Sequence, residues 1–387
     1  MRILGNDYIK TYLSYMLHNK GKVQSDDFRF FHTENLAADD DPYYFKEASV
    51  PLEFSSIEYR HKGRRRLEDF HSFMRRTGTT SLIIIKDDTI LFERYYNGHR
   101  RGSAQKLFSI TKSFTSALIG KAIEEGYISS VHDPIRMYIS ELQGCNMTIK
   151  QLLQMDAGIQ FTEGHFPWRD EAKVFLHPNA RQLALSVKEA TSPNHFHYND
   201  YHPLLLGIIL ERTTGRRVID YLYDKIWRPL GMQYSGQLIM DSQPSSFAKL
   251  ESGLVMSALD LAKFGALYLH KGMWRGQQII QQKWIEESVN PDGVPSIKEH
   301  FHYYRNHPWG KMWFQHHKAY YKYLWWGHLK ADTNYDYFAL GALGQVLYVS
   351  PDNHTIAIRT GQEWGVMDWW PTILYQLINC SPMVRQI

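Results

Sequence analysis

Cysteine is nearly absent from this 387-residue chain, since Cys145 and Cys380 are its two copies and lie far apart. So few cysteines exclude a disulfide-stapled scaffold and favour reduced, structural thiols. Long apolar runs are missing as well, because no window reaches the ~18 apolar residues of a membrane-spanning helix. The opening "MRILGNDYIKTYLSYM" has no apolar stretch followed by a small-residue cleavage site. We therefore expect a cytoplasmic protein that does not bind a membrane.

A strong excess of one charge sign is also missing. The formal net charge of +4 is small for this length and indicates no polyanionic partner. The short basic runs "HKGRRR" and "GHRRG" have no nucleic-acid motif around them and are typical of a solvated face. We expect no nucleic-acid partner, and no pattern favours a particular oligomeric state.

Aromatic residues, in contrast, are plentiful, with 11 Trp, 25 Tyr and 19 Phe, many of them in the last third. A well-filled core and an aromatic-walled pocket both account for them. Strand-like runs occur near both ends of the chain, in "TSLIIIKDDTILFERYYNG" and "YDYFALGALGQVLYVSPDNHTIAIRTG", and the stretch between them is largely helical. Residues 86–88 predict a hairpin turn within the first run. Proline and glycine bound a predicted helix at 203–215, and the closing "MDWWPTILYQLIN" is expected to form a helix that covers the sheet. This order predicts an α+β fold, in which an antiparallel sheet built from both chain ends carries an all-helical insertion. The predicted parts are an extension (1–60), a sheet subdomain (61–105 and 245–387) and a helical subdomain (106–244).

The stretch "LFSITKSFTSALIGKAIEEGYI" places Ser109 and Lys112 three residues apart at the start of an apolar helix. Residues at this spacing share one helix face. Burial among apolar neighbours would lower the pKa of the lysine and let it take the serine proton, which activates the hydroxyl as a nucleophile. The S-x-x-K pattern also occurs at Ser103 and Ser246, but only the copy at Ser109 opens an apolar helix directly after a strand and turn.

Several further segments carry a resemblance to a known family, in that family's order. They are "MTIKQLLQMDAGIQFTE", "FHYNDYHPLLLGIILERTTG", "SGLVMSALDLAKFGALYLHKGMWRGQQII" and "YLWWG" with the strands after it. Together with S-x-x-K, they resemble the serine β-lactamase and penicillin-binding protein superfamily, in its class C-like branch of esterases and 6-aminohexanoate-dimer hydrolases. The resemblance implies a β-lactamase-like fold with the active site between the two subdomains. It also implies ester or amide hydrolysis through an acyl-serine, without a cofactor or metal.

The resemblance assigns residue roles in the motif "YND". Tyr198 stands at the family's catalytic tyrosine, which shares proton transfer with Lys112 and passes the proton to the leaving group. Asp200 replaces the usual asparagine. Two interpretations stay open for Asp200: it holds Lys112 charged and leaves Tyr198 as the working base, or it caps the following helix.

The family's K-T-G strand has two candidate matches, and we choose residues 339–345, "ALGALGQ", over "RTG" at 359–361. By resemblance, the backbone N–H groups of Ser109 and Ala342 form the oxyanion hole, and Gly341 lies against the substrate. Ala339 then replaces the cation that helps hold a substrate carboxylate. This loss argues for an esterase or amidase with weak or no β-lactamase activity.

Trp325 and Trp326 match a tryptophan-bearing loop at the family's site and are expected to wall an acyl pocket, with weaker candidates in Tyr96, Phe166 and Trp168.

Three alternatives compete with this assignment. His195, His197 and His202 lie close in sequence, but their spacing is a weak zinc template and no H-E-x-x-H occurs. An acyltransferase would share the acyl-serine. A non-catalytic relative that binds a ligand in the old pocket is the third. The absence of G-x-S-x-G around Ser109 excludes an α/β-hydrolase.

Overall fold

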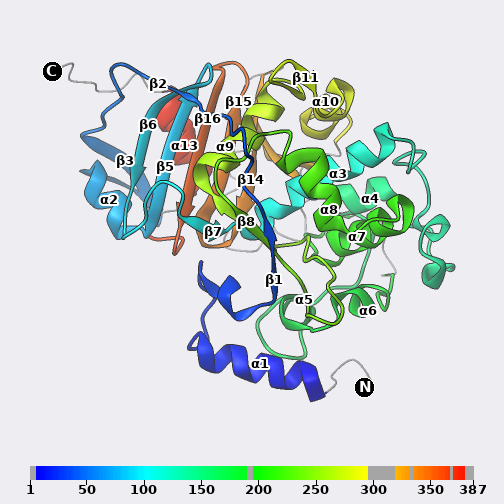
Figure 1. Cartoon of the computed structure of the whole chain (residues 1–387). Helices are drawn as coiled ribbons and strands as arrows, with labels where there is room; N and C mark the ends of the chain where they lie inside the picture. Colours follow the sequence, from blue (N-terminus) through cyan, green and yellow to red (C-terminus); the bar gives the residue numbers. More distant parts are fainter. Residues whose placement is uncertain (1–5, 190–194, 295–318, 331–333, 367–368, 380–387) are drawn as a thin grey trace.

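The computed structural model describes residues 6–189, 195–294, 319–330, 334–366 and 369–379 (Figure 1). Its main sheet has eight strands, which pair antiparallel except for the short parallel pair β2–β6. In spatial order they are β12 (Ala319–Lys322), β13 (Trp325–Leu329), β14 (Tyr335–Gly341), β15 (Gln345–Ser350), β16 (Thr355–Gly361), β5 (Thr79–Lys86), β6 (Thr89–Tyr95) and β2 (Lys46–Glu47). Both ends of the chain contribute, since β16 pairs with β5.

The hairpin predicted around residues 86–88 is confirmed as β5 and β6. Lys86 pairs with Thr89, and Asp87 and Asp88 between them have φ of 48° and 56°. Two consecutive left-handed residues form the two-residue turn whose twist matches that of paired strands. Asp is one of the residue types that tolerate this conformation, so local turn chemistry defines this edge of the sheet.

Two helices cover opposite faces of the sheet (Figure 1). A Cβ placed on Gly265 of α9 (Ala258–Leu269) would lie 3.0 Å from Ile356 of β16, so this helix packs closely against one face. Trp370 of α13 (Trp370–Asn379) instead lies over the guanidinium of Arg359, whose side chain points to the other face because side chains alternate along a strand. The segment expected to form a covering helix at the C-terminal side is therefore confirmed.

The middle of the chain is helical, as predicted, up to its last residues. Its helices are α3 (Thr111–Glu124), α4 (Ile149–Gln154), α5 (Asp170–Leu176), α6 (Ala180–Ala184), α7 (Tyr201–Thr214) and α8 (Val218–Leu222). Residues 201–210 of α7 are all buried, and the helix ends at Gly215 with φ of 65°. The range predicted as all-helical, 106–244, also contains β8 (Gly236–Ile239). This strand joins β1 (Thr33–Leu36), β9 (Leu254–Ser257) and β7 (Ala104–Lys106) in a second sheet.

The N-terminal extension is built into the molecule. Its helix α1 (Asn6–His18) lies beside α5 (Figure 1), and β1 is an edge strand of the second sheet. A fully buried ion pair joins the extension to the segment before Ser109: Lys106 Nζ lies 2.9 Å from Asp27 Oδ1, and both side chains are 0% exposed. The hydroxyl of Tyr15 donates to the other oxygen of Asp27 at 2.7 Å. These bonds satisfy a buried charge pair that would otherwise be costly.

Other strands and α-helices lie around these layers. They are β3 (Ser56–His61) with β4 (Arg64–Asp69), α2 (Phe70–Arg76), β10 (Met273–Trp274) with β11 (Gln277–Gln278), and α10 (Gln282–Val289). Among the described helices, none combines the length and apolar character needed to cross a bilayer. Cys145 has a free thiol, and Cys380 lies outside the described residues.

Candidate active site

Ser109 and Lys112 meet at the start of α3. Ser109 lies in the single 3-10 turn η2 (Phe108–Ile110), and Lys112 lies in the first turn of the α-helix. The preceding Phe108 has φ of 51°, a conformation that a bulky residue adopts only when its surroundings enforce it. Lys112 Nζ donates to Ser109 Oγ at 2.7 Å, and the lysine is 1% exposed. The geometry therefore joins a candidate nucleophile directly to a buried cation.

The lysines of the other two S-x-x-K copies bind elsewhere. Lys106 pairs with Asp27, and Lys249 Nζ lies 3.0 Å from Glu251 Oε1. Lys249 also donates to a backbone carbonyl at 2.6 Å. In the described part of the chain, the lysines of these two S-x-x-K copies therefore have structural partners and do not contact Ser109.

Lys112 is held as an ammonium. Its Nζ lies 2.8 Å from Asp200 Oδ1 and donates to the backbone carbonyl of Glu251 at 2.7 Å. Burial by itself would lower the pKa of Lys112, but the Asp200 carboxylate and Tyr198 outweigh burial and raise this pKa above its ordinary value. Desolvation acts in the expected direction, but the expected net fall in the pKa of Lys112 is wrong, because the Asp200 carboxylate reaches the ammonium, as one of the two interpretations of Asp200 foresaw.

Asp200 makes the contact with Lys112 that the first of its two interpretations requires. It occupies the N-cap position of α7, yet its side chain makes no capping hydrogen bond. The side chain of Asn199 caps the start of α7 instead, since its Oδ1 accepts a hydrogen bond from Tyr201 N–H at 2.9 Å. The pairing of Asp200 with Lys112 is confirmed, and the capping alternative is not.

Tyr198 lies over the same cation, with Lys112 Nζ 4.9 Å from its ring centroid. Burial raises the pKa of Tyr198, and the Asp200 charge adds to this rise. The Lys112 charge and the hydrogen bonds with Ser109 and Lys112 oppose it without cancelling it. The indole of Trp326 stacks on the phenol ring at 5.7 Å with an interplanar angle of 13°. Tyr198 is thus a neutral phenol held between Lys112 and an aromatic wall.

The end of β14 closes on the catalytic turn. A Cβ on Gly341 would lie 2.2 Å from the carbonyl oxygen of Leu107, so only glycine lets the strand approach Ser109 this closely. Ala342 opens the next turn, η7 (Ala342–Gly344). The buried guanidinium of Arg359 supports that turn by donating to the carbonyls of Leu343 at 3.0 Å and Gly344 at 2.6 Å. Of residues 339–345, those from Leu340 to Leu343 line the cavities at Ser109, and Arg359 of "RTG" supports their turn from behind.

Two cavities meet at Ser109. The first, here called the aromatic cavity, has a volume of about 830 Å³. Its lining consists of Ser109, Phe161, Glu163, Gly164, Glu171, Tyr198, Asp200, Trp326, Leu340, Gly341, Ala342, Trp364 and Trp369. The expected residues Ser109, Tyr198, Asp200, Gly341 and Ala342 are therefore together in one cleft.

The aromatic wall differs in part from expectation. Trp326 lines the aromatic cavity, but Trp325 is fully buried against Phe264 and Tyr268, so the structure does not support a substrate-binding role for Trp325. Adjacent strand residues point to opposite faces, which separates the two tryptophans. The three weaker candidates Tyr96, Phe166 and Trp168 are also outside the described lining. Sequence reasoning missed the wall residues Phe161, Trp364 and Trp369. The two tryptophans had a signal in the aromatic cluster "EWGVMDWW", and Phe161 lies in the segment "MTIKQLLQMDAGIQFTE" without a signal of its own.

The second cavity, here called the N-terminal cavity, has a volume of about 880 Å³ and shares Ser109, Glu171, Asp200 and Ala342 with the first. Residues 19–24, which follow α1, form part of its wall. The sequence predicted no function for this extension. The extension contributes to the cavity wall because α1 packs beside α5, and no local sequence pattern predicts this contact.

The histidine alternative finds no support at the site. His202 is buried, its Nδ1 bonds to the carbonyl of Asn199 at 3.1 Å, and burial lowers the pKa of its imidazole to about 3. Within the described ranges, no group of three or more histidine, cysteine or acidic side chains is arranged to hold a metal ion.

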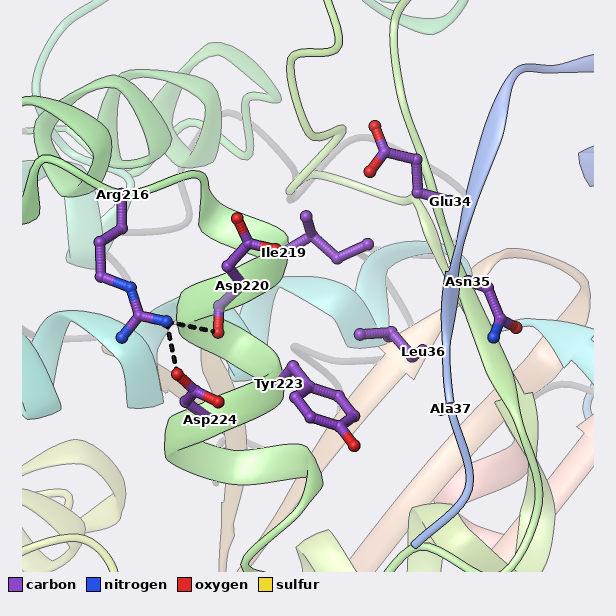
Figure 2. Close-up of a pocket in the computed structure, with 9 residues that line it drawn as sticks. All are labelled: Glu34, Asn35, Leu36, Ala37, Arg216, Ile219, Asp220, Tyr223 and Asp224. Carbon is purple, nitrogen blue, oxygen red and sulfur yellow. Dashed lines mark hydrogen bonds and ion pairs between the residues drawn. The ribbon is translucent and has the colours of Figure 1, made fainter.

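A further hollow of about 610 Å³ lies between β1 and α8, and Ser109 is not among its lining residues (Figure 2). Figure 2 shows that Arg216 turns toward Asp220 and Asp224. It donates to the Asp224 carboxylate at 2.5 Å and to the Asp220 carbonyl at 3.1 Å. Its charge is therefore satisfied within the helix.

The family model described as Beta-lactamase matches residues 65–359. This chain belongs to the β-lactamase family. Among known proteins, the 6-aminohexanoate-dimer hydrolase of Paenarthrobacter ureafaciens is 24% identical over 236 residues, which cover 57% of this chain and 59% of that protein. The chain thus spans about three fifths of that relative's length.

Solved structures show the same β-lactamase-family fold. A protein from Bacillus anthracis assigned as a 6-aminohexanoate-dimer hydrolase superposes with a TM-score of 0.75 at 19% identity, covering 97% of this chain and 93% of that one. EstCE1, described as a hydrolase with promiscuous acyltransferase activity, gives a TM-score of 0.59 at 11% identity, covering 78% and 93%. The predicted α+β, β-lactamase-like fold and the predicted superfamily are confirmed.

Proposed function

We propose that this chain is a serine hydrolase that cleaves an ester or amide through an acyl-serine intermediate on Ser109. The observation that carries the proposal is the 2.7 Å contact between Ser109 Oγ and Lys112 Nζ, in a cleft that Tyr198 also lines. The hydrolase assignment at this coarse level agrees with the named relatives. The serine mechanism and the residue roles are our proposal.

The charge state of the site determines how the proton moves. Lys112 begins as an ammonium, Tyr198 as a phenol and Asp200 as a carboxylate. As Ser109 Oγ attacks the carbonyl carbon, Lys112 passes one proton to Asp200 and takes the serine proton. The carbonyl π bond opens to an oxyanion, and the net change is one proton moved from Ser109 to Asp200. The aspartate thus serves as the proton sink that a lone buried ammonium lacks.

Collapse of the tetrahedral intermediate reverses this flow. The bond to the leaving oxygen or nitrogen breaks, and Tyr198 gives its phenol proton to the leaving group. Lys112 then reprotonates Tyr198, and Asp200 returns a proton to Lys112. Water repeats the cycle on the acyl-serine and regenerates Ser109.

In this proposal the backbone N–H groups of Ser109 and Ala342 stabilise the oxyanion, and both residues line the aromatic cavity. Each donor of this kind typically contributes about 10²–10³ in rate. The close approach of Gly341 to Leu107 supports this assignment because it brings the end of β14 against the catalytic turn.

The aromatic cavity favours an apolar portion of the substrate, and Ala339 argues against efficient β-lactamase activity because no lysine stands there. Acyl transfer is the second candidate, since EstCE1 shares the fold and is described with that activity. A non-catalytic ligand-binding relative is the third. The scarcity of cysteine supports a reducing compartment such as the cytoplasm.

Intact mass after incubation with a small fluorophosphonate tests the proposal. We expect one adduct on the wild type, none on Ser109→Ala, and an unchanged adduct on the matched control Ser103→Ala, whose serine belongs to another S-x-x-K copy. Turnover of chromogenic esters and amides should disappear with the adduct. A folded wild type that takes no label and turns over none of these substrates would favour the non-catalytic alternative.

A further inference from the structure

The turn after α1 is a preformed part of the active-site wall. Lys20 and Gly21 have φ of 51° and 70°, and Gly21 N–H donates to the carbonyl of Met16 at 2.9 Å. This is the bonding of a left-handed helix C-cap, which gives the chain a defined exit direction. Residues 19–24 are therefore oriented by the helix end.

Contacts far apart in sequence hold this turn against the catalytic body. The hydroxyl of Tyr8 donates to the Pro167 carbonyl at 2.8 Å, and the hydroxyl of Tyr12 donates to the His165 carbonyl at 3.0 Å. The buried Asp27–Lys106 pair fixes the chain beyond the turn. Both sides of the turn are thus tied to the segments that surround Ser109.

Three side chains on this turn are hydrogen-bond donors without an acceptor. Lys20 and Lys22 are exposed, line the N-terminal cavity, and form no ion pair with any described residue. Asn19 lines the same cavity and is 4% exposed, and its buried Nδ2 makes no hydrogen bond in the structure. The unsatisfied buried amide of Asn19 is costly unless an acceptor arrives, and the two exposed ammonium groups beside it are not paired with any described carboxylate.

The cavity also contains four carboxylates, and two of them are paired with lysines other than Lys20 and Lys22. Asp200 pairs with Lys112, and Glu251 pairs with Lys249. Glu171 accepts the N–H of Gly164 at 2.5 Å. Glu363 is exposed to solvent. Positive charge on the turn therefore remains available to a ligand.

We propose that residues 19–24 form an anion subsite that binds a carboxylate of the substrate through Lys20 and Lys22. The subsite supplies from the N-terminal extension the cation that Ala339 no longer provides on β14. It rests on the proposed hydrolase function and narrows it to esters or amides with an apolar part and a free carboxylate on opposite sides of the scissile bond. The apolar part then occupies the aromatic cavity.

Paired chromogenic esters test the subsite: 4-nitrophenyl butyrate and mono-(4-nitrophenyl) glutarate, with 3-carboxy-4-nitrophenyl butyrate to place the charge on the leaving group. In the variant Lys20→Gln/Lys22→Gln, we expect the ratio of kcat/KM for the preferred anionic ester to that for the neutral ester to fall about three- to tenfold, as for loss of two exposed charge contacts. Added salt should lower the same ratio in the wild type by screening.

The matched control is Lys10→Gln, a loss of charge on the same segment at an exposed lysine 3.9 Å from Asp7 and outside both cavities. It should leave the ratio unchanged. An unchanged ratio in the double variant, or an equal fall in the control, would overturn the subsite.

Calorimetric binding of glutarate to Ser109→Ala separates failure of the subsite from failure of the proposed function. Binding that weakens when Lys20→Gln/Lys22→Gln is added supports the subsite even where no ester is hydrolysed, an outcome that would refute the hydrolase alone. Turnover of neutral esters without glutarate binding and without a change in the ratio would refute the subsite alone.

Discussion

Asp200 Oδ1 lies 2.8 Å from Lys112 Nζ, at a position where the resemblance leads one to expect an asparagine. The pair changes the electrostatics of the whole site, because the carboxylate keeps Lys112 charged and also raises the pKa of Tyr198. A nucleophile beside a permanent ammonium needs a second proton acceptor. Asp200 supplies it within hydrogen-bond distance of that ammonium.

Asp200→Asn should therefore lower ester turnover near neutral pH by about 10²–10⁴-fold, the range of a lost acid–base partner. Without the carboxylate the pKa of Lys112 falls, so more of the lysine is neutral as the pH rises. Activity of the variant should consequently recover at alkaline pH. The measurement is kcat against pH from 6 to 10 with a neutral ester, and a profile that superposes on the wild type would refute the proton-sink role.

Gly341→Ala should impair both the site and the fold. The new Cβ would meet the Leu107 carbonyl at 2.2 Å, and backbone does not yield as a flexible side chain does. We expect at least a tenfold loss of kcat and a loss of unfolding free energy of about 1–3 kcal/mol, as for overpacked sites. The control is Gly144→Ala, where a Cβ meets nothing within 4 Å. Denaturant titration and ester kinetics check both, and equal effects at the two glycines would contradict the close-approach argument.

Sequence motifs alone predicted many of the residues that line the candidate active site. The S-x-x-K and "YND" patterns and the strand end at 339–345 name residues that the fold brings into one cleft. Local rules also predicted the 86–88 hairpin and the end of α7 at Gly215. These features could be predicted because each depends on residues a few positions apart, whose spacing and turn chemistry determine the local conformation.

The missed features depend on contacts between distant segments. The sequence does not distinguish Trp325 from Trp326 as a wall residue. The pairing of β13 with β14 decides which of the two side chains faces the cavity. The choice between the two interpretations of Asp200 needs its contact with Lys112, 88 residues away, and the N-terminal wall needs Tyr8 to reach Pro167, 159 residues away. The hydrophobic periodicity of a sequence does not encode contacts between such distant residues.

Asp156 should make the stability of the protein depend on pH. It is 8% exposed, its Oδ1 has no hydrogen bond, and burial raises the pKa of its carboxyl to about 7. Above about pH 4 the unfolded chain releases this proton while the folded protein retains it, so the free energy of unfolding falls from about pH 4 to pH 7 and then levels off.

Asp156→Asn removes this titration. The variant should match the wild type near pH 4 and exceed it above pH 7, by up to about 4 kcal/mol. Urea unfolding at pH 4, 6 and 8 measures the difference. A stability gap that is the same at all three values would show that Asp156 is ionised in the folded protein.

The buried pair Lys106–Asp27 should couple the stability of the N-terminal extension to that of the catalytic turn. Lys106→Met leaves Asp27 charged, buried and without its cation, which should cost about 3–5 kcal/mol of unfolding free energy. It also disturbs the packing under Phe108, because Lys106 Nζ lies 4.8 Å from that ring centroid. The double variant Asp27→Leu/Lys106→Met removes both charges and should recover part of the lost stability. Denaturant unfolding of the wild type, of Lys106→Met and Asp27→Leu alone, and of the double variant measures the coupling. If the double variant is destabilised by the sum of its two single variants, the pair is not coupled, and the extension does not support Ser109 through Lys106.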